Sequence, residues 1–144
     1  MSKIRKESIY SKLKDLSNSV YYIEEFLPAD SRELEDRGNR NKLYKEVEFA
    51  IQLVVDICAI INSDVSKTTP NDEDSIVESL KKEKVLSPSV TEKIQNMKGF
   101  RNILVHRYGE VNDEEAYENI SNGLNDFGDF IREIENFLKK NKNK

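Results

Sequence analysis

Apolar residues recur along this chain at steps of three and four, the spacing that places side chains on one face of an α-helix. The first such run comprises Ile9, Leu13, Leu16, Val20, Ile23 and Leu27, and the last comprises Ile120, Leu124, Phe127, Ile131, Ile134 and Leu138. Pro28 ends the first run, because the residue before a proline disfavours helical backbone. Both runs therefore predict long amphipathic helices, and the alternating steps of the last one are typical of nearly antiparallel packing.

The centre of the chain carries the most continuous apolar pattern. Nearly every position between Phe49 and Ile61 is apolar, which predicts a helix that is buried on most of its sides. This helix should begin near Asp30, or near Lys42 if Gly38 breaks the segment.

Turn-forming residues divide the rest of the chain. Residues 62–74 are mostly polar and predict a loop, which is followed by a short helix ending near Leu86. The Ser-Pro pair at 87–88 suits the N-cap and first position of a further helix. Gly109 is placed to end that helix, and Asp113 to cap the last one.

Composition agrees with an all-α fold. The 144 residues include only five glycines and three prolines, too few for the many turns of an all-β protein. Charged residues make up 35% of the chain, which suits the solvated exterior of a helical bundle. We therefore expect one domain over residues 1–138, an up-and-down bundle of four to five helices, followed by a basic tail at 139–144.

The net charge argues against general nucleic-acid binding. The formal charge is −4 and the isoelectric point is about 5.2, whereas nucleic-acid-binding surfaces are basic. Any contact with RNA must therefore be local. Basic residues gather at Lys3, Arg5 and Lys6, at Arg32, Arg37, Arg40, Lys42 and Lys45, and at Lys139, Lys140, Lys142 and Lys144.

The single cysteine and the hydropathy pattern favour a cytoplasmic protein without a membrane span. Cys58 lies in an apolar run without a disulfide partner, so we expect a small buried hydrophobic residue. No apolar stretch approaches the length of a membrane span, and no signal-peptide pattern opens the sequence. One histidine and one distant cysteine give no metal-ligand spacing, and we expect neither a metal nor a cofactor.

Candidate chemistry lies around His106, the single histidine. Its imidazole, with an ordinary pKa of about 6.5, suits proton transfer at cellular pH. Arg101 can hold phosphate oxygens with a planar fork of N–H donors, and Asn102 can orient a hydroxyl or a phosphate. This set fits metal-free RNA cleavage, in which a base takes the ribose 2′-OH proton and a cation stabilises charge on phosphorus. The products would be a 2′,3′-cyclic phosphate end and a 5′-hydroxyl end.

Helix geometry separates the two charged groups of this candidate site. Five residues at about 100° each place Arg101 and His106 roughly 140° apart around one straight helix. Either the helix unwinds near Val105, or a second copy of the chain completes the site. We favour a two-fold homodimer, which would bring two copies of each group into one cleft.

Two other sets of residues have open interpretations. Glu48, Gln52 and Asp56 form a polar line at i, i+4 and i+8 on the most apolar helix. The line faces either the dimer cleft or Arg101, where it finds hydrogen-bond partners, or it is an exposed stripe. The remaining tyrosines, Tyr10, Tyr21, Tyr22, Tyr44 and Tyr117, are expected to pack or to lie at the surface rather than to stack on bases.

The segment GFRNILVHRYGE resembles the R-x4-H-x-Y signature of HepT-type toxins in the HEPN superfamily. The preceding segments YKEVEFAIQLVVDICAII and SPSVTEKIQNMKGF resemble the same family, and the resemblance covers most of residues 1–138. It implies an HEPN-like homodimeric, metal-independent ribonuclease that acts on tRNA or mRNA. Its implied partner is a minimal nucleotidyltransferase antitoxin.

The resemblance also implies roles for individual residues. Arg101 and His106 match the catalytic pair, and Asn102 matches the polar residue that commonly follows the arginine. Tyr108 matches a tyrosine that such antitoxins modify with AMP, although a packing tyrosine is the alternative. Arg107 lies at the variable position of the motif, where it can add a phosphate contact.

Two other classes of function are compatible with the same residues. A non-catalytic helical module could bind a nucleotide or a partner and regulate a nucleotidyltransferase, and the acidic net charge favours this alternative slightly. A purely structural dimerisation bundle would leave Arg101 and His106 freely replaceable. Both alternatives predict that the protein does not cleave RNA.

Overall fold

The computed structural model describes residues 4–66, 72–106 and 111–141, with the side chain of His106 left out. Within these ranges the chain forms α1 (Lys6–Phe26), a short 3-10 helix η1 (Ser31–Glu35), α2 (Arg37–Val65), α3 (Glu73–Lys82), α4 (Pro88–His106) and α5 (Asp113–Lys140). The part of the chain that is described contains no strand. The prediction of an all-α bundle is confirmed.

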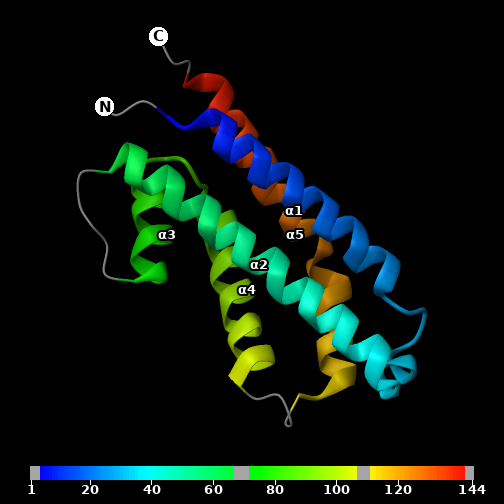
Figure 1. Ribbon diagram of the computed structural model, residues 1–144. Helices are drawn as coiled ribbons and strands as arrows, with labels where there is room; N and C mark the ends of the chain where they lie inside the picture. Colours follow the sequence, from blue (N-terminus) through cyan, green and yellow to red (C-terminus); the bar gives the residue numbers. More distant parts are fainter. Residues whose placement is uncertain (1–3, 67–71, 107–110, 142–144) are drawn as a thin grey trace.

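Helix α2 is the centre of the bundle. It contacts α1 along one side and α3 and α4 along the other, and η1 near its N-terminal end (Figure 1). Its buried side chains point in several directions because they occupy eight of the twelve positions from Ala50 to Ile61. The apolar run at the centre of the sequence therefore folds as predicted, as a helix buried on most of its sides.

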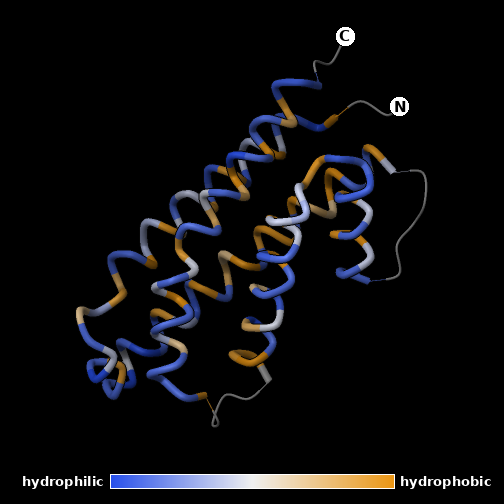
Figure 2. The backbone as a smooth tube through the Cα atoms, turned by 180° about the vertical axis from the view of Figure 1, so that it is seen from behind, coloured by the Kyte–Doolittle hydropathy of each residue, from blue (hydrophilic) through white to orange (hydrophobic). Residues whose placement is uncertain are grey.

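The apolar faces of the outer helices close the core around α2. In Figure 2 hydrophobic and hydrophilic segments alternate along each helix, as expected for helices with one buried face. In α5 the predicted seam is buried at Ile120, Phe127, Ile134 and Leu138, and Phe130, which was not in the seam, is fully buried as well.

Side-chain caps decide where the helices begin, and they correct two predictions. Asp36 accepts a hydrogen bond from the Asn39 amide at 3.0 Å, so α2 begins at Arg37 and continues through Gly38. The predicted break at Gly38 is wrong, because a glycine in a capped first turn disrupts little. Asn112 caps α5 instead of Asp113, accepting from the Glu115 amide at 3.1 Å.

Two further boundaries differ from the predictions. Helix α2 continues to Val65 and α3 begins at Glu73, so helix occupies both ends of the segment predicted as a loop. Helix α5 continues through Lys140, so it includes the first two residues of the basic stretch at 139–144. Gly109, the predicted end of α4, lies outside the described residues.

Cys58 lies in the core with no solvent exposure. Burial raises the pKa of its thiol to about 12, which keeps the sulfur protonated at neutral pH. The expectation of a small buried hydrophobic residue is confirmed for this position. None of the helices in the described ranges is long and apolar enough to cross a bilayer.

Two tyrosine hydroxyls, those of Tyr44 and Tyr117, hold the start of α5 through partly buried hydrogen bonds. Tyr44 of α2 donates to the Asp113 carboxylate at 2.5 Å, and Arg40 approaches the same carboxylate at 3.7 Å. Burial and this hydrogen bond raise the pKa of Tyr44. Tyr117 donates to the carbonyl of Pro28 at 2.7 Å. These contacts join the first turns of α5 to α2 and to the residues that follow α1.

Candidate functional site

The first turns of α4 are fixed to α5. The Ser87 hydroxyl accepts from the Val90 amide at 3.1 Å, which confirms the predicted N-cap, and Ser87 also donates to Glu133. Lys93 donates to Asp129 at 2.7 Å, and this hydrogen bond lowers the pKa of Asp129. Helix α4 also contacts α2 and α3.

Arg101 is bound by side chains from two other helices. Its Nη1 donates to Gln52 Oε1 of α2 at 3.1 Å, and its Nη2 donates to Glu73 Oε1 of α3 at 2.7 Å. The Arg101 side chain is only 12% exposed. Gln52 in turn donates to Asp56 at 2.9 Å. The guanidinium therefore has a defined orientation, with part of its hydrogen-bonding edge already occupied.

The predicted polar line on α2 therefore reaches Arg101 through its middle member. Glu48 lies one turn before Gln52 and pairs with Lys45 at 3.7 Å. The three side chains are exposed or half-buried rather than deep in the core. The polar line therefore combines two of the expected arrangements: it contacts Arg101, and it is also partly exposed to solvent.

Glu73 and Lys98 are components of the site that sequence reasoning missed. Lys98 lies one turn before Arg101 with its side chain 8% exposed, and its ammonium binds Asp74 of α3. Residues 73 and 74 belong to the polar segment that was predicted as a loop. Acidic residues follow no helical period in that segment, so the sequence does not show which way they face. Their contacts with α4 become visible only in the structure, where α3 begins at Glu73.

Two hollows adjoin at this point of α4, and Asn102 lines both. The hollow toward α2 has a volume of about 470 Å³ and is lined by Lys45, Glu48, Phe49, Gln52, Arg101, Asn102 and Val105. The hollow toward α3 has a volume of about 700 Å³ and is lined by Asp72, Glu73, Asp74, Glu78, Gln95, Lys98, Gly99 and Asn102. The structure thus brings Arg101 and Asn102 to one surface, where each can reach a ligand.

The remaining motif residues lie at the edge of what the structure describes. His106 is the last residue of α4, and its side chain, with Arg107 and Tyr108, lies outside the described residues. The backbone of α4 is helical through His106, so the alternative in which the helix unwinds near Val105 is wrong. On a continuous helix, the separation of roughly 140° between Arg101 and His106 remains.

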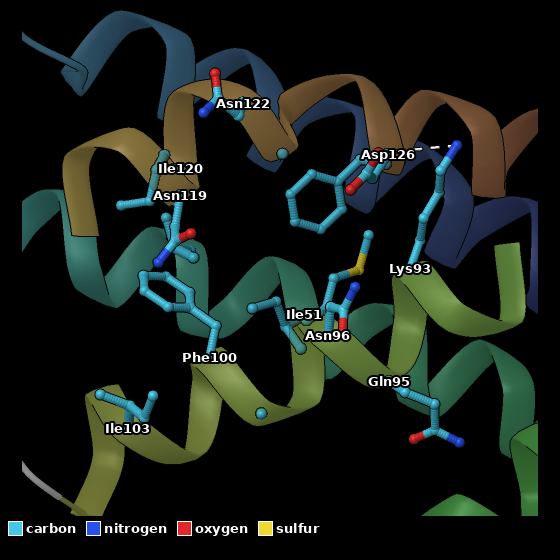
Figure 3. Close-up of a pocket in the computed structure, with 15 residues that line it drawn as sticks. Ile51, Lys93, Gln95, Asn96, Phe100, Ile103, Asn119, Ile120, Asn122 and Asp126 are labelled. Carbon is cyan, nitrogen blue, oxygen red and sulfur yellow. Dashed lines mark ion pairs between the residues drawn. The ribbon is translucent and has the colours of Figure 1, made fainter. Parts of the chain in front are cut away.

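A third hollow separates the C-terminal half of α4 from the N-terminal half of α5. It has a volume of about 550 Å³, and its apolar lining includes Phe100, Ile103, Ile120 and Phe127. Figure 3 shows Phe100 of α4 directed toward Asn119 and Ile120 of α5, with Ile103 farther along α4. Ile103, which lines this hollow, is 43% exposed.

The residues described contain no group of three or more histidine, cysteine, aspartate or glutamate side chains that could hold a metal ion. Helix α4 presents a guanidinium, a buried ammonium and an amide at this site, from Arg101, Lys98 and Asn102. Such groups bind and stabilise anions, with phosphate as the natural candidate.

Comparison with solved structures identifies the fold. The structure is similar to YutE, a cytosolic protein of unknown function from Bacillus subtilis, with a TM-score of 0.82, 18% identity and coverage of 97% of this chain and 94% of the other. It is similar to a tri-AMPylated Shewanella oneidensis HEPN toxin in complex with MNT antitoxin, with a TM-score of 0.81, 21% identity and coverage of 94% and 98%.

A further similar structure is a toxin–antitoxin complex, MntA–HpeT, that carries a tyrosine-to-alanine mutation; its TM-score is 0.80, its identity 20%, and the coverage is 88% and 97%. The comparison with curated protein sequences gives no match. The fold is thus that of the HEPN toxins. Residues 16–134 match the family model described as Ribonuclease HepT-like, and the chain belongs to this HepT-like family.

The side chains of Arg101 and Glu73 should be energetically coupled in the stability of the fold. A double-mutant cycle with Arg101→Met and Glu73→Ala measures the interaction energy of this pair alone. It excludes the separate stabilisation that Glu73 gives α3 as an acidic residue in the first turn of the helix. We expect a coupling free energy of about 1 kcal/mol, because the arginine is largely shielded from water while the glutamate is partly exposed. Urea unfolding followed by circular dichroism measures it.

The exposed pair of Glu78 and Lys81 on the same helix is the matched control. Its cycle with Glu78→Ala and Lys81→Met should give less than about 0.5 kcal/mol, as is usual for surface pairs on a helix. Equal coupling in the two cycles would show that the Arg101 contact is an ordinary surface ion pair.

Proposed function

We propose that this protein is a metal-independent endoribonuclease toxin of a toxin–antitoxin system, which cleaves tRNA or mRNA in the cytoplasm. The observation that carries the proposal is the Arg101 guanidinium, which is held by Gln52 and Glu73 at the edge of a hollow beside Asn102. Membership of the HepT-like family supports it. A fixed cation of this kind suits the stabilisation of charge that develops on a phosphate.

In the proposed reaction, neutral His106 takes the proton of a ribose 2′-hydroxyl. The 2′-oxygen then forms a bond to the adjacent phosphorus while the bond to the 5′-oxygen breaks. A protonated histidine returns a proton to the departing oxygen, which leaves a 2′,3′-cyclic phosphate and a 5′-hydroxyl. Arg101 stabilises the additional negative charge on the phosphate oxygens, Asn102 orients the hydroxyl or the phosphate, and Arg107 adds a phosphate contact.

Cleavage should depend on the motif and not on a metal. We expect Arg101→Lys and His106→Ala each to reduce RNA cleavage by about a hundredfold or more, because an ammonium cannot reproduce the planar fork and no other imidazole exists in the chain. Cleavage is followed on gels with tRNA and mRNA in the presence of a chelator, and the ends are analysed for cyclic phosphate.

Arg132→Ala is the control, since it removes an exposed cation on α5 far along the chain from the motif. Wild-type cleavage by His106→Ala, or complete inhibition of the wild type by the chelator, would contradict the mechanism. RNA binding without cleavage by the wild type would favour the second candidate, a non-catalytic module that regulates a nucleotidyltransferase. The four carboxylates that line the neighbouring hollow favour this second candidate.

We further propose that the active form is a homodimer. The separation of Arg101 and His106 around one continuous helix calls for a second copy, so that the arginine of one chain meets the histidine of the other. The groove between α4 and α5, which is lined by Phe100, Ile120 and the exposed Ile103, is the surface that we assign to the second copy. It adjoins the end of α4 that carries the motif.

Replacing Ile103 with aspartate should separate the dimer, because it places a charge in an apolar interface. Light scattering should give twice the 16.7 kDa chain mass for the wild type and the single mass for Ile103→Asp. The control is Tyr10→Asp on α1, since Tyr10 is 45% exposed and Ile103 is 43% exposed. A wild type that is monomeric at all concentrations would disprove the assignment.

Finally, we propose that a nucleotidyltransferase antitoxin silences the toxin by transferring AMP to Tyr108. The similar Shewanella oneidensis toxin is described as tri-AMPylated and in complex with MNT antitoxin, which supports this step. Transfer from a nucleoside triphosphate would bond the phosphorus to the tyrosine oxygen and release pyrophosphate. The attached group adds bulk and negative charge two residues from His106, where it repels an RNA phosphate.

Mass spectrometry of the toxin co-produced with its antitoxin should show added AMP on the peptide that contains Tyr108. The modified protein should cleave RNA more slowly than the unmodified protein. Tyr108→Phe should lose the addition at this position, whereas Tyr10→Phe, at an exposed tyrosine of α1, should retain it. An unmodified Tyr108 peptide in the presence of active antitoxin would refute the proposal.

A further inference from the structure

The two hollows beside Asn102 differ in charge. Four carboxylates and one ammonium, that of Lys98, line the hollow toward α3. The hollow toward α2 has the cations Lys45 and Arg101 against the single carboxylate of Glu48. A polyanion bound at Arg101 is repelled on the α3 side and is attracted on the α2 side. Any strand that continues beyond the bound phosphate therefore extends over α2.

The hollow toward α2 continues into another hollow, which lies between α1 and α2. Lys45 and Phe49 line both, and the second hollow has a volume of about 590 Å³. From Gln52 back to Lys42 this face of α2 spans eleven residues, or about 15 Å along the helix. This surface runs from the arginine toward the start of α2 and is long enough for a few nucleotides.

Aromatic faces are gathered in the second hollow. Phe49 is 51% exposed and Tyr22 is 48% exposed, although large aromatic side chains usually bury most of their surface. Tyr22 stacks on Phe26 with ring centroids 6.0 Å apart and an angle of 21° between the ring planes. The ammonium of Lys42 lies over the Phe26 ring at 5.0 Å from its centroid. Exposed rings beside flexible cations are the combination that binds unpaired bases and their phosphates.

The acidic residues of this surface are partly engaged. Glu46 accepts from the Ser19 hydroxyl at 2.6 Å, and Glu48 pairs with Lys45 at 3.7 Å. Asp15 also lines the hollow between α1 and α2. The Lys45 side chain is 79% exposed, so it can turn from Glu48 to a phosphate at little cost. The surface is therefore close to neutral, and stacking should supply more of the affinity than charge.

We propose that Tyr22, Phe49, Lys42 and Lys45 form a binding site for the single-stranded RNA that continues from the scissile phosphate, with Phe49 stacking on the nearest unpaired base. This inference rests on the proposed ribonuclease function, whose substrate it describes as unpaired RNA. It also revises the expectation for Tyr22, which lies at the surface as predicted but in a position to stack on bases.

Direct binding tests the site independently of cleavage. The probe is a fluorescein-labelled single-stranded RNA of mixed sequence, bound to the full chain carrying His106→Ala so that the probe stays intact. In this background Phe49→Ala should weaken binding about tenfold, the usual loss when one stacking platform is removed. Phe49→Tyr keeps an aromatic face and should bind within about twofold of the parent.

The lysines are tested by salt dependence. Lys42→Gln together with Lys45→Gln should reduce the slope of log binding constant against log salt by about 1.4, because about 0.7 counterions are released per phosphate of a single strand. Tyr10→Ala removes a comparably exposed aromatic ring of α1 outside this surface and should bind as the parent does. Thermal unfolding of each variant shows that the fold is kept.

Different results identify different failures. If the parent binds RNA and Phe49→Ala binds equally well, the proposed site is wrong even where the wild type cleaves RNA. If Phe49→Ala weakens binding while the wild type never cleaves, the site stands and the ribonuclease proposal fails. If Phe49→Ala leaves RNA binding intact but weakens binding of the antitoxin, the surface is a protein interface and the inference is overturned. A parent that binds no single-stranded RNA also overturns it.

Discussion

The binding of Arg101 by Gln52 and Glu73 is the interaction on which the rest of the site depends. It joins α4 to α2 and α3 through one planar group, and it fixes a side chain that would otherwise occupy many rotamers. The glutamate has a cost for function, because a carboxylate 2.7 Å from the guanidinium competes with a phosphate. The neutral Gln52 has no such cost, so the cation keeps its attraction on the α2 side.

The helices themselves could be predicted from the sequence, because burial of an amphipathic face imposes a period that sequence shows directly. Helix ends were less predictable, since they depend on which of several neighbouring side chains forms the cap. The caps are formed by Asp36 and Asn112, whereas the sequence suggested a break at Gly38 and a cap at Asp113. Asp113 instead accepts a hydrogen bond from Tyr44, a contact 69 residues away in the chain.

The site was predictable only along α4. Arg101, Asn102 and His106 share one short segment, so the sequence shows them together, although their spacing places Arg101 and His106 on different faces of α4. Glu73 reaches Arg101 across 28 residues and Asp74 reaches Lys98 across 24, and no periodic pattern marks these partners. Such contacts are set by how α3 packs on α4. The aromatic surface on α1 and α2 was missed for the same reason, because Tyr22 and Phe49 meet only after the two helices pair.

The acidic net charge becomes consistent with an RNA substrate once charge is considered locally. A chain with a formal charge of −4 has little general affinity for RNA, since nonspecific binding depends on neutralising many phosphates. The carboxylates of α3 strengthen this repulsion on one side of Arg101, while Lys42 and Lys45 relieve it on the other. RNA that extended from Arg101 toward α3 would be repelled by the carboxylates that line that hollow. An acidic chain with one nearly neutral, aromatic surface beside Arg101 would therefore favour binding of the proposed RNA substrate in one orientation over binding in many.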